Sequence, residues 1–192
     1  MGVLGQIHTV FSLIAVFAGA IVFLKTKGTR WHRTLGHIYF TSMAGVVVTS
    51  FSIYDLTGSF NGLHWFALLS AITLGMAMFH VLARRPKQNW MVWHSNWMAW
   101  SYVGLIAALF AEIVTRIAVP LAAPILDQSQ LWSLFWGLVL LVALVVSVAG
   151  LYLIKIQLPK TLKRLQTRGY AHEKMVSSLF GSWRHRRGDG PF

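Results

Sequence analysis

The sequence predicts an all-α membrane protein, an up-down bundle of about five transmembrane helices with its N-terminus outside and its C-terminus in the cytoplasm. Three observations lead to this fold class. First, 56% of the 192 residues are hydrophobic and only 11% are charged, whereas soluble domains carry about 25% charged residues. Second, five apolar stretches reach the ~20 residues that a helix needs to cross a bilayer. Third, basic residues collect in alternate connections between these stretches.

The apolar stretches define the predicted spans. They run over residues 5–24, 36–56, 62–83, 94–119 and 131–156. No basic residue precedes the first stretch, so we expect it to remain as a span and not to act as a signal peptide. All five prolines are expected in loops or in the tail, which predicts continuous helices.

The basic residues predict the orientation. Sixteen of the 17 lysines and arginines fall on one side: four in residues 25–33, three in residues 84–87 and nine from Lys155 to Arg187, with only Arg116 on the other side. Because basic loops are retained in the cytoplasm, the expected location is a bacterial inner membrane. The net charge of +12 is explained by this topology, so no nucleic-acid partner is predicted.

The chain is predicted to divide into a membrane part and a tail. Residues 1–156 form the bundle, with a histidine-lined core over 5–119 and a scaffold helix over 131–156, and residues 157–192 form a basic cytoplasmic tail. Apolar residues recur in the tail at helical spacing. They are Leu162, Leu165, Val176 and Leu179. This pattern predicts a helix on the anionic inner leaflet, or a segment that docks a partner.

Four predicted helices carry one histidine each on a face of small or polar residues: His8, His37, His64 and His94. Ionisable groups inside lipid are costly and usually mark function. From the rise of 1.5 Å per residue, His8 and His64 lie near the outer ends of their helices, and His37 and His94 lie near the inner ends. First and third helices are diagonal in an up-down bundle, as are second and fourth. We therefore expect His8 to pair with His64, and His37 with His94.

Two histidine pairs at two depths suit two b-type haems, each with its iron held by two imidazoles. Such a protein would carry electrons across the membrane between a quinone or soluble reductant and an acceptor. The alternative is that these histidines are hydrogen-bonded interfacial residues without a cofactor. His80 points about 160° away from His64 and is expected to contact headgroups or to act as a third inner ligand. His32 is expected in a solvated loop, or as a donor to an inner substrate.

Two further features near the predicted spans have structural and functional interpretations. Glu112 and Arg116 have the i, i+4 spacing of a local ion pair. In the functional interpretation, Arg116 binds a haem propionate, a quinone oxygen or a lipid phosphate, while Glu112 handles a proton. Tryptophans recur at the start of the 94–119 span and predict an interfacial aromatic belt or a stacking surface for a cofactor. They are Trp90, Trp93, Trp97 and Trp100.

Short motifs over residues 5–116 resemble an uncharacterised family of predicted bacterial membrane proteins, a domain of unknown function. The motif residues are His8, Lys27, Gly28, His32, Arg33, Gly36, Tyr39, His64, His94, Met98, Tyr102, Ala108 and Arg116. The resemblance implies a small helical membrane bundle and no established activity. The arrangement of histidines also resembles that of cytochrome b561-like dihaem proteins, except that the separation of sixteen positions from His64 to His80 places these two on opposite faces.

Three other classes of function remain open. A zinc or copper protein would use the same four histidines, but no histidine pair has the i, i+3 or i, i+4 spacing of helical metal motifs. A transporter is disfavoured by unbroken helices and the lack of an internal repeat. An accessory subunit of a larger membrane complex would suit Ala143 and Ser147, which have small-xxx-small spacing. The absence of cysteine excludes disulfides and covalent haem attachment.

Overall fold

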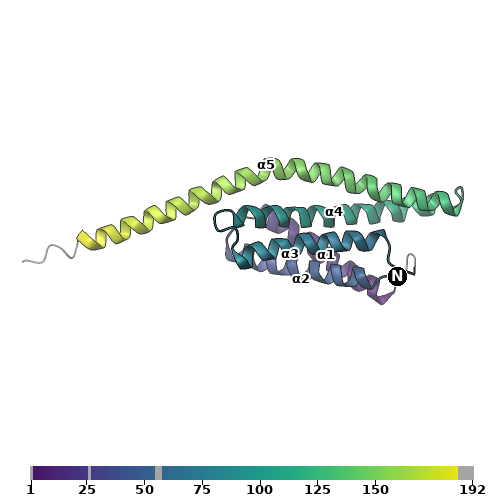
Figure 1. Cartoon of the computed structure of the whole chain (residues 1–192), viewed down its shortest axis with the longest axis horizontal. Helices are drawn as coiled ribbons and strands as arrows, with labels where there is room; N and C mark the ends of the chain where they lie inside the picture. Colours follow the sequence, from purple (N-terminus) through teal and green to yellow (C-terminus); the bar gives the residue numbers. More distant parts are fainter. Residues whose placement is uncertain (1, 26, 55–57, 186–192) are drawn as a thin grey trace, which may run out of the picture. The chain divides into compact units, whose positions relative to one another are not determined.

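The computed structural model describes residues 2–25, 27–54 and 58–185, and the secondary structure in them is helical (Figure 1). The helices are α1 (Val3–Leu24), α2 (Arg30–Ser52), α3 (Gly62–Ala83), α4 (Trp90–Ala122) and α5 (Gln128–His185). The all-α prediction is confirmed. The chain divides into two compact units, Met1–Ile154 and Lys155–Phe192. The tail residues Leu162, Leu165, Val176 and Leu179 lie outside the side chains that the structure describes.

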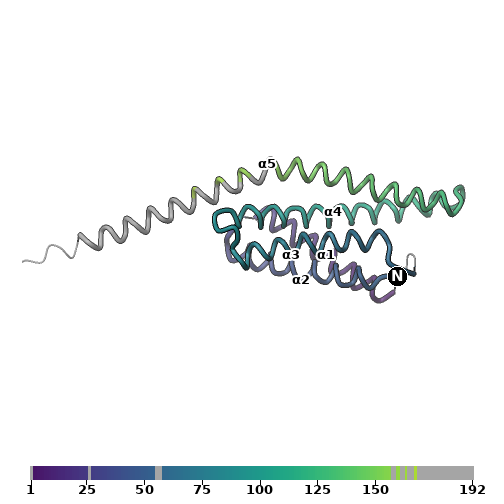
Figure 2. The backbone as a smooth tube through the Cα atoms, viewed as in Figure 1, coloured from purple at the N-terminus to yellow at the C-terminus, as the bar shows by residue number. Residues whose placement is uncertain are grey.

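In the first unit, α1 to α4 form an up-down bundle. α1 packs along α2, α2 along α3, α3 along α4, and α4 along α1, and Figure 2 shows these four helices running alongside one another. The pairs α1/α3 and α2/α4 are therefore diagonal, as predicted. Within the same unit α5 reaches α4 where Gly150 lies against the Val103 side chain.

Within the described residues, four helices are apolar and long enough to cross a membrane: α1, α3, α4 and the Gln128–Ile156 part of α5. α2 is not one of these four, although it has 23 residues. Its polarity comes from two arginines, two histidines and several hydroxyl side chains. The helix itself satisfies the hydroxyl groups of Ser50 and Ser52, since each donates to a carbonyl one turn earlier. Backbone and hydroxyl groups paired in this way are compatible with a lipid environment. The orientation across the membrane stays a prediction.

The helix boundaries differ from the predicted spans at two prolines. Pro120 lies in the last turn of α4 and Pro159 lies inside α5, so their expected place outside helices was wrong. Pro120 lacks a backbone N–H, but it lies so near the end of α4 that few helical hydrogen bonds are affected. α2 also begins earlier, at Arg30 and not at residue 36, because Thr29 caps the helix by accepting the backbone N–H of His32 at 3.1 Å.

The bundle core is built around two tyrosines. Tyr39 is 1% exposed, and its hydroxyl lies 2.9 Å from Ser101 Oγ, which joins the diagonal helices α2 and α4. Tyr102 donates to the Val16 carbonyl of α1 at 3.3 Å. Gly19 leaves the space that the Tyr102 ring occupies. Small apolar residues and leucines complete this core: Ala15, Ala18, Met43, Leu74 and Leu105.

Lys27 closes the turn between α1 and α2. Its Nζ donates to the carbonyls of Val22 and Phe23 at 2.6 and 2.8 Å, and these belong to the last turn of α1, where carbonyls have no helical partner. Gly28 follows with a φ of +80°, a conformation that favours glycine. The Lys27-Gly28 motif thus has a structural role.

Replacing Lys27 by methionine is expected to destabilise the bundle by about 1–2 kcal/mol, because two charge-assisted hydrogen bonds to a helix C-terminus are lost. Thermal unfolding of the detergent-solubilised protein measures this. The matched control is Lys25→Met, which removes the same charge from an exposed side chain in the same turn and should cost much less. Equal losses for the two variants would contradict the capping role.

Candidate functional site

The histidines of α1 to α4 lie toward the two ends of the bundle. The end of α1, the start of α2, the end of α3 and the start of α4 meet at what we call the His94 end. The start of α1, the end of α2, the start of α3 and the end of α4 meet at the His8 end. Each predicted histidine pair belongs to one of these ends.

His94 lies in the first turns of α4 and is anchored to α3. Its Nδ1 is 3.0 Å from the Ala77 carbonyl. Because a carbonyl only accepts, Nδ1 carries the proton and Nε2 has a free lone pair. Histidines that bind metals usually have their other ring nitrogen held in this way. His94 therefore has the tautomer that a metal or haem iron needs.

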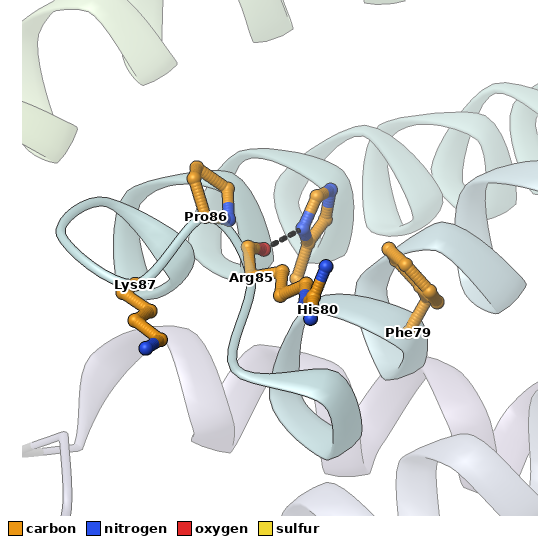
Figure 3. Close-up of a pocket in the computed structure, with 5 residues that line it drawn as sticks. All are labelled: Phe79, His80, Arg85, Pro86 and Lys87. Atoms are coloured by element: carbon orange, nitrogen blue, oxygen red, sulfur yellow. Dashed lines mark hydrogen bonds between the residues drawn. The ribbon is translucent and has the colours of Figure 1, made fainter.

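His80 has the same tautomer. Its Nδ1 donates to the Arg85 carbonyl at 2.6 Å (Figure 3), and its ring stacks on Trp93 with a centroid separation of 5.8 Å. The side chain is only 7% exposed, and its buried Nε2 has no hydrogen-bond partner within the described residues. The structure thus buries His80 in the protein, where a headgroup contact was expected.

His32 is half-buried in the first turn of α2, where a solvated loop residue was expected. Its Nδ1 is buried and finds no partner in the described part of the chain. Burial, followed by the nearby charges of Lys27 and His94, lowers the pKa of His32. His32 and His94 therefore lie within electrostatic range of each other at this end, and they come from the diagonal helices α2 and α4.

His37 is exposed. It lies five residues after His32, which is about 140° further round the helix, so the two histidines of α2 cannot face the same way. Tyr39 and Met43 follow His32 by seven and eleven residues, and both are buried in the core. The inward face of α2 is therefore the His32 face.

At the His8 end, the two histidines have opposite tautomers. His8 Nδ1 lies 2.9 Å from Thr49 Oγ1, and Thr49 already donates its own proton to the Gly45 carbonyl at 2.7 Å. His8 therefore donates from Nδ1 and keeps Nε2 free. In contrast, His64 Nδ1 accepts the Asn61 backbone N–H at 3.1 Å, so its proton is on Nε2.

Two aromatic rings and a capping box hold the His64 ring in place. Its ring is 4.9 Å from Tyr54 and 4.7 Å from Phe60, and it stacks with both. His64 and Asn61 form a reciprocal capping box at the start of α3. The buried Nε2–H has no partner among the described residues.

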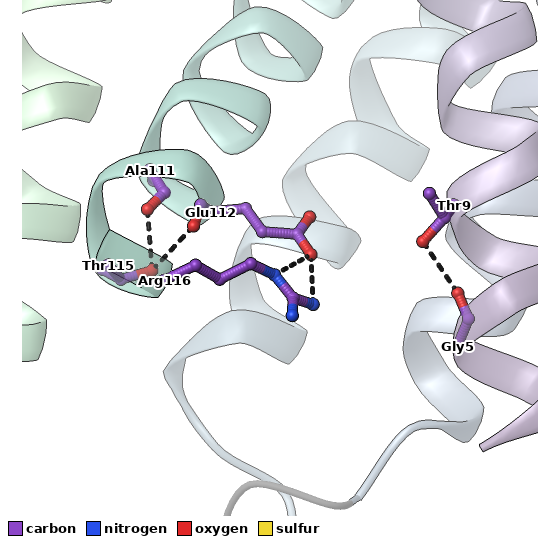
Figure 4. Close-up of polar contacts among 6 residues, drawn as sticks. All are labelled: Gly5, Thr9, Ala111, Glu112, Thr115 and Arg116. Atoms are coloured by element: carbon purple, nitrogen blue, oxygen red, sulfur yellow. Dashed lines mark hydrogen bonds and ion pairs between the residues drawn. The ribbon is translucent and has the colours of Figure 1, made fainter. Parts of the chain in front are cut away.

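Glu112 and Arg116 form a local ion pair near the His8 end (Figure 4). Arg116 donates from Nε and Nη2 to the same Glu112 oxygen, at 2.9 and 2.6 Å. The side chains are 45% and 55% exposed, so the pair points away from the core. The Glu112 carboxylate nevertheless lies within electrostatic range of His8.

The predicted pairs do not fit two bis-histidine haems. His8 and His94 have a free Nε2, but His64 carries its proton there and His37 is exposed. The spaces beside Gly19 and Gly45 are filled by the rings of Tyr102 and Phe11. Across residues 2–25, 27–54 and 58–185, no three His, Asp or Glu side chains are placed to hold a metal ion. His32, on the inward face of α2, lies instead within electrostatic range of His94 on the diagonal helix α4.

The helical fold, with histidines at both ends of the bundle, defines a small polytopic membrane protein. The chain belongs to the family described as "Predicted membrane protein (DUF2306)", whose sequence model matches residues 5–149. This confirms the predicted membrane-protein family, and with it an integral membrane protein embedded in lipid. No curated protein and no solved structure matches the chain. The likeness to cytochrome b561-like proteins gains no support from these comparisons.

Proposed function

We propose that this membrane protein holds one histidine-bound redox cofactor, a b-type haem, at the His94 end, with His32 and His94 as its ligands. The observation that carries the proposal is a concentration of buried polar atoms without partners. Of the four such side-chain atoms in the described residues, three lie at this end: His32 Nδ1, His80 Nε2 and Trp97 Nε1. Buried polar groups are normally hydrogen-bonded, and exceptions call for a ligand, an ion or water.

The ligand assignment follows from the tautomers and the helix faces. His94 has its Nδ1–H held by the Ala77 carbonyl, which leaves Nε2 for iron. His32 comes from the diagonal helix and lies within electrostatic range of His94. A neutral imidazole is required for ligation. Burial, and after it the positive charge of Lys27, lowers the pKa of His32 and so favours its neutral form.

A bound b-type haem would supply one-electron transfer. The Ala77 carbonyl orients the proposed ligand His94, and the Trp93 ring and the Arg85 carbonyl orient His80, which is not a ligand. Trp97 lies three residues after His94, and its unpartnered indole N–H can donate to an anionic group such as a propionate. This proposal replaces two haems by one.

Visible spectroscopy of the full chain, produced with haem available, tests the proposal. We expect a Soret band and a reduced-minus-oxidised α-band in the wild-type protein, and the loss of both in His94→Ala and His32→Ala. His37→Ala is the matched control, because it removes an exposed histidine five residues away on the same helix, and its spectrum should be unchanged.

The proposal fails if the purified protein shows no haem bands. It also fails if His37→Ala removes the bands and His32→Ala does not, since that would restore the ligand predicted from the sequence. Stoichiometric zinc or copper in a haem-free protein would favour a metal ion at the same histidines. Size-exclusion chromatography of each variant shows whether it is folded.

A further inference from the structure

The loop between α3 and α4 carries an open depression that contains neither of the proposed haem ligands. It has a volume of about 610 Å³ and is lined by Phe79, His80, Arg85, Pro86 and Lys87 (Figure 3). A depression of this volume is large enough for a small ligand. Phe79 is 50% exposed, and with Pro86 it gives the depression an apolar wall.

The charge at its rim is positive. Arg84, Arg85 and Lys87 are exposed, and the chain has no Asp or Glu between residues 56 and 111. The first turn of α4 begins at Trp90, and the preceding Asn89 makes no side-chain capping bond. The positive end of the helix dipole therefore adds to the basic side chains.

Contacts with α3 and α4 hold this loop in place. The His80 ring donates to the Arg85 carbonyl at 2.6 Å and stacks on Trp93 of α4. This fastens the backbone of Arg85 to both helices. The loop thus presents its basic groups from a fixed backbone position.

We propose that this depression binds an anionic phospholipid, with the phosphate at Arg85 and Lys87 and the start of an acyl chain against Phe79 and Pro86. An apolar wall beneath a cationic rim matches a lipid, which has an anionic head joined to an apolar chain. A free anion would use the rim alone. The site shares His80 with the cofactor end but includes neither of the proposed ligands, His32 and His94, so loss of lipid binding and loss of haem can be told apart.

Native mass spectrometry of the full chain in detergent, titrated with phosphatidylglycerol or phosphatidylcholine, tests this site. We expect wild-type protein to bind phosphatidylglycerol in preference to phosphatidylcholine. The Arg85→Gln/Lys87→Gln variant should bind phosphatidylglycerol about 30-fold more weakly, since each basic residue near an anionic lipid contributes about five-fold. Lys87→Gln alone, a change at an exposed loop position, should weaken binding about five-fold.

The matched control is Arg30→Gln/Arg33→Gln, which removes two exposed charges from the start of α2 at the same end of the bundle. Its preference for phosphatidylglycerol should be unchanged. Equal losses in the two double variants would show a general effect of surface charge and overturn the site. The proposal is also overturned if the wild type shows no preference between the lipids, or if inorganic phosphate competes as effectively as phosphatidylglycerol.

Discussion

Replacing Gly19 by alanine is expected to destabilise the bundle by about 1–3 kcal/mol, the range typical of overpacked cores. A Cβ at this position would lie 2.5 Å from two carbons of the Tyr102 ring and 3.0 Å from the Tyr39 ring. Neither ring can move away easily, because Tyr39 is bonded to Ser101 and Tyr102 to the Val16 carbonyl. Alanine is otherwise favoured over glycine in helices by about 1 kcal/mol, so a net loss must come from the contact.

The matched control is Gly75→Ala in α3, where an added Cβ would meet no atom within 4 Å. This variant should be as stable as the wild type or slightly more stable. Thermal unfolding in detergent, followed by circular dichroism, compares the two. If Gly19→Ala unfolded at the wild-type temperature, that result would contradict the close contact between α1 and the two tyrosine rings.

The positions of the helices could be predicted because each apolar stretch can be found from the hydropathy of its own residues. The 62–83 span coincides with α3 (Gly62–Ala83), and the 5–24 span matches α1 (Val3–Leu24). The diagonal arrangement followed from short connections between antiparallel neighbours. Each of these inferences needs only the order and length of apolar stretches.

The inward face of α2 could not be predicted in the same way. The sequence pattern favoured the face of His37, which carries Thr41 and Ser52, but the structure exposes these residues. A hydroxyl can bond to its own helix, as Thr41 does with the His37 carbonyl at 2.9 Å. Thr9 with Gly5 and Thr115 with Ala111 do the same (Figure 4). Because Thr41 is exposed whereas Thr115 is buried, a small polar residue alone does not identify the inward face of a helix.

Histidine tautomers and the burial of His80 also have no signal in the sequence. Each tautomer depends on whether the group beside Nδ1 is a carbonyl, as for His94, or a backbone N–H, as for His64. His80 is enclosed by Trp93 and by the loop that carries Arg85. Contacts from a neighbouring helix and a loop leave no helical periodicity to detect, so the candidate site required the structure.

Replacing Tyr39 by alanine is expected to cost about 3–5 kcal/mol, the range found when a buried aromatic side chain is removed from a core. Tyr39 is 1% exposed and packs in the cluster with Ala15, Ala18 and Leu105. Thermal unfolding or denaturation in dodecyl sulfate measures the loss. Among the substitutions considered, this one should reduce stability most, because it leaves a cavity where α2 meets the rest of the bundle.

Tyr39→Phe separates packing from the hydrogen bond. It keeps the ring but removes the bond to Ser101, which is 2.9 Å long in the wild type. Hydrogen bonds between membrane helices contribute about 0.6 kcal/mol on average, so this variant should lose far less than Tyr39→Ala. The double variant Tyr39→Phe/Ser101→Ala should recover part of that small loss, because neither partner is then left unpaired. If Tyr39→Phe cost as much as Tyr39→Ala, the hydrogen bond between α2 and α4 would hold this core, and packing would be secondary.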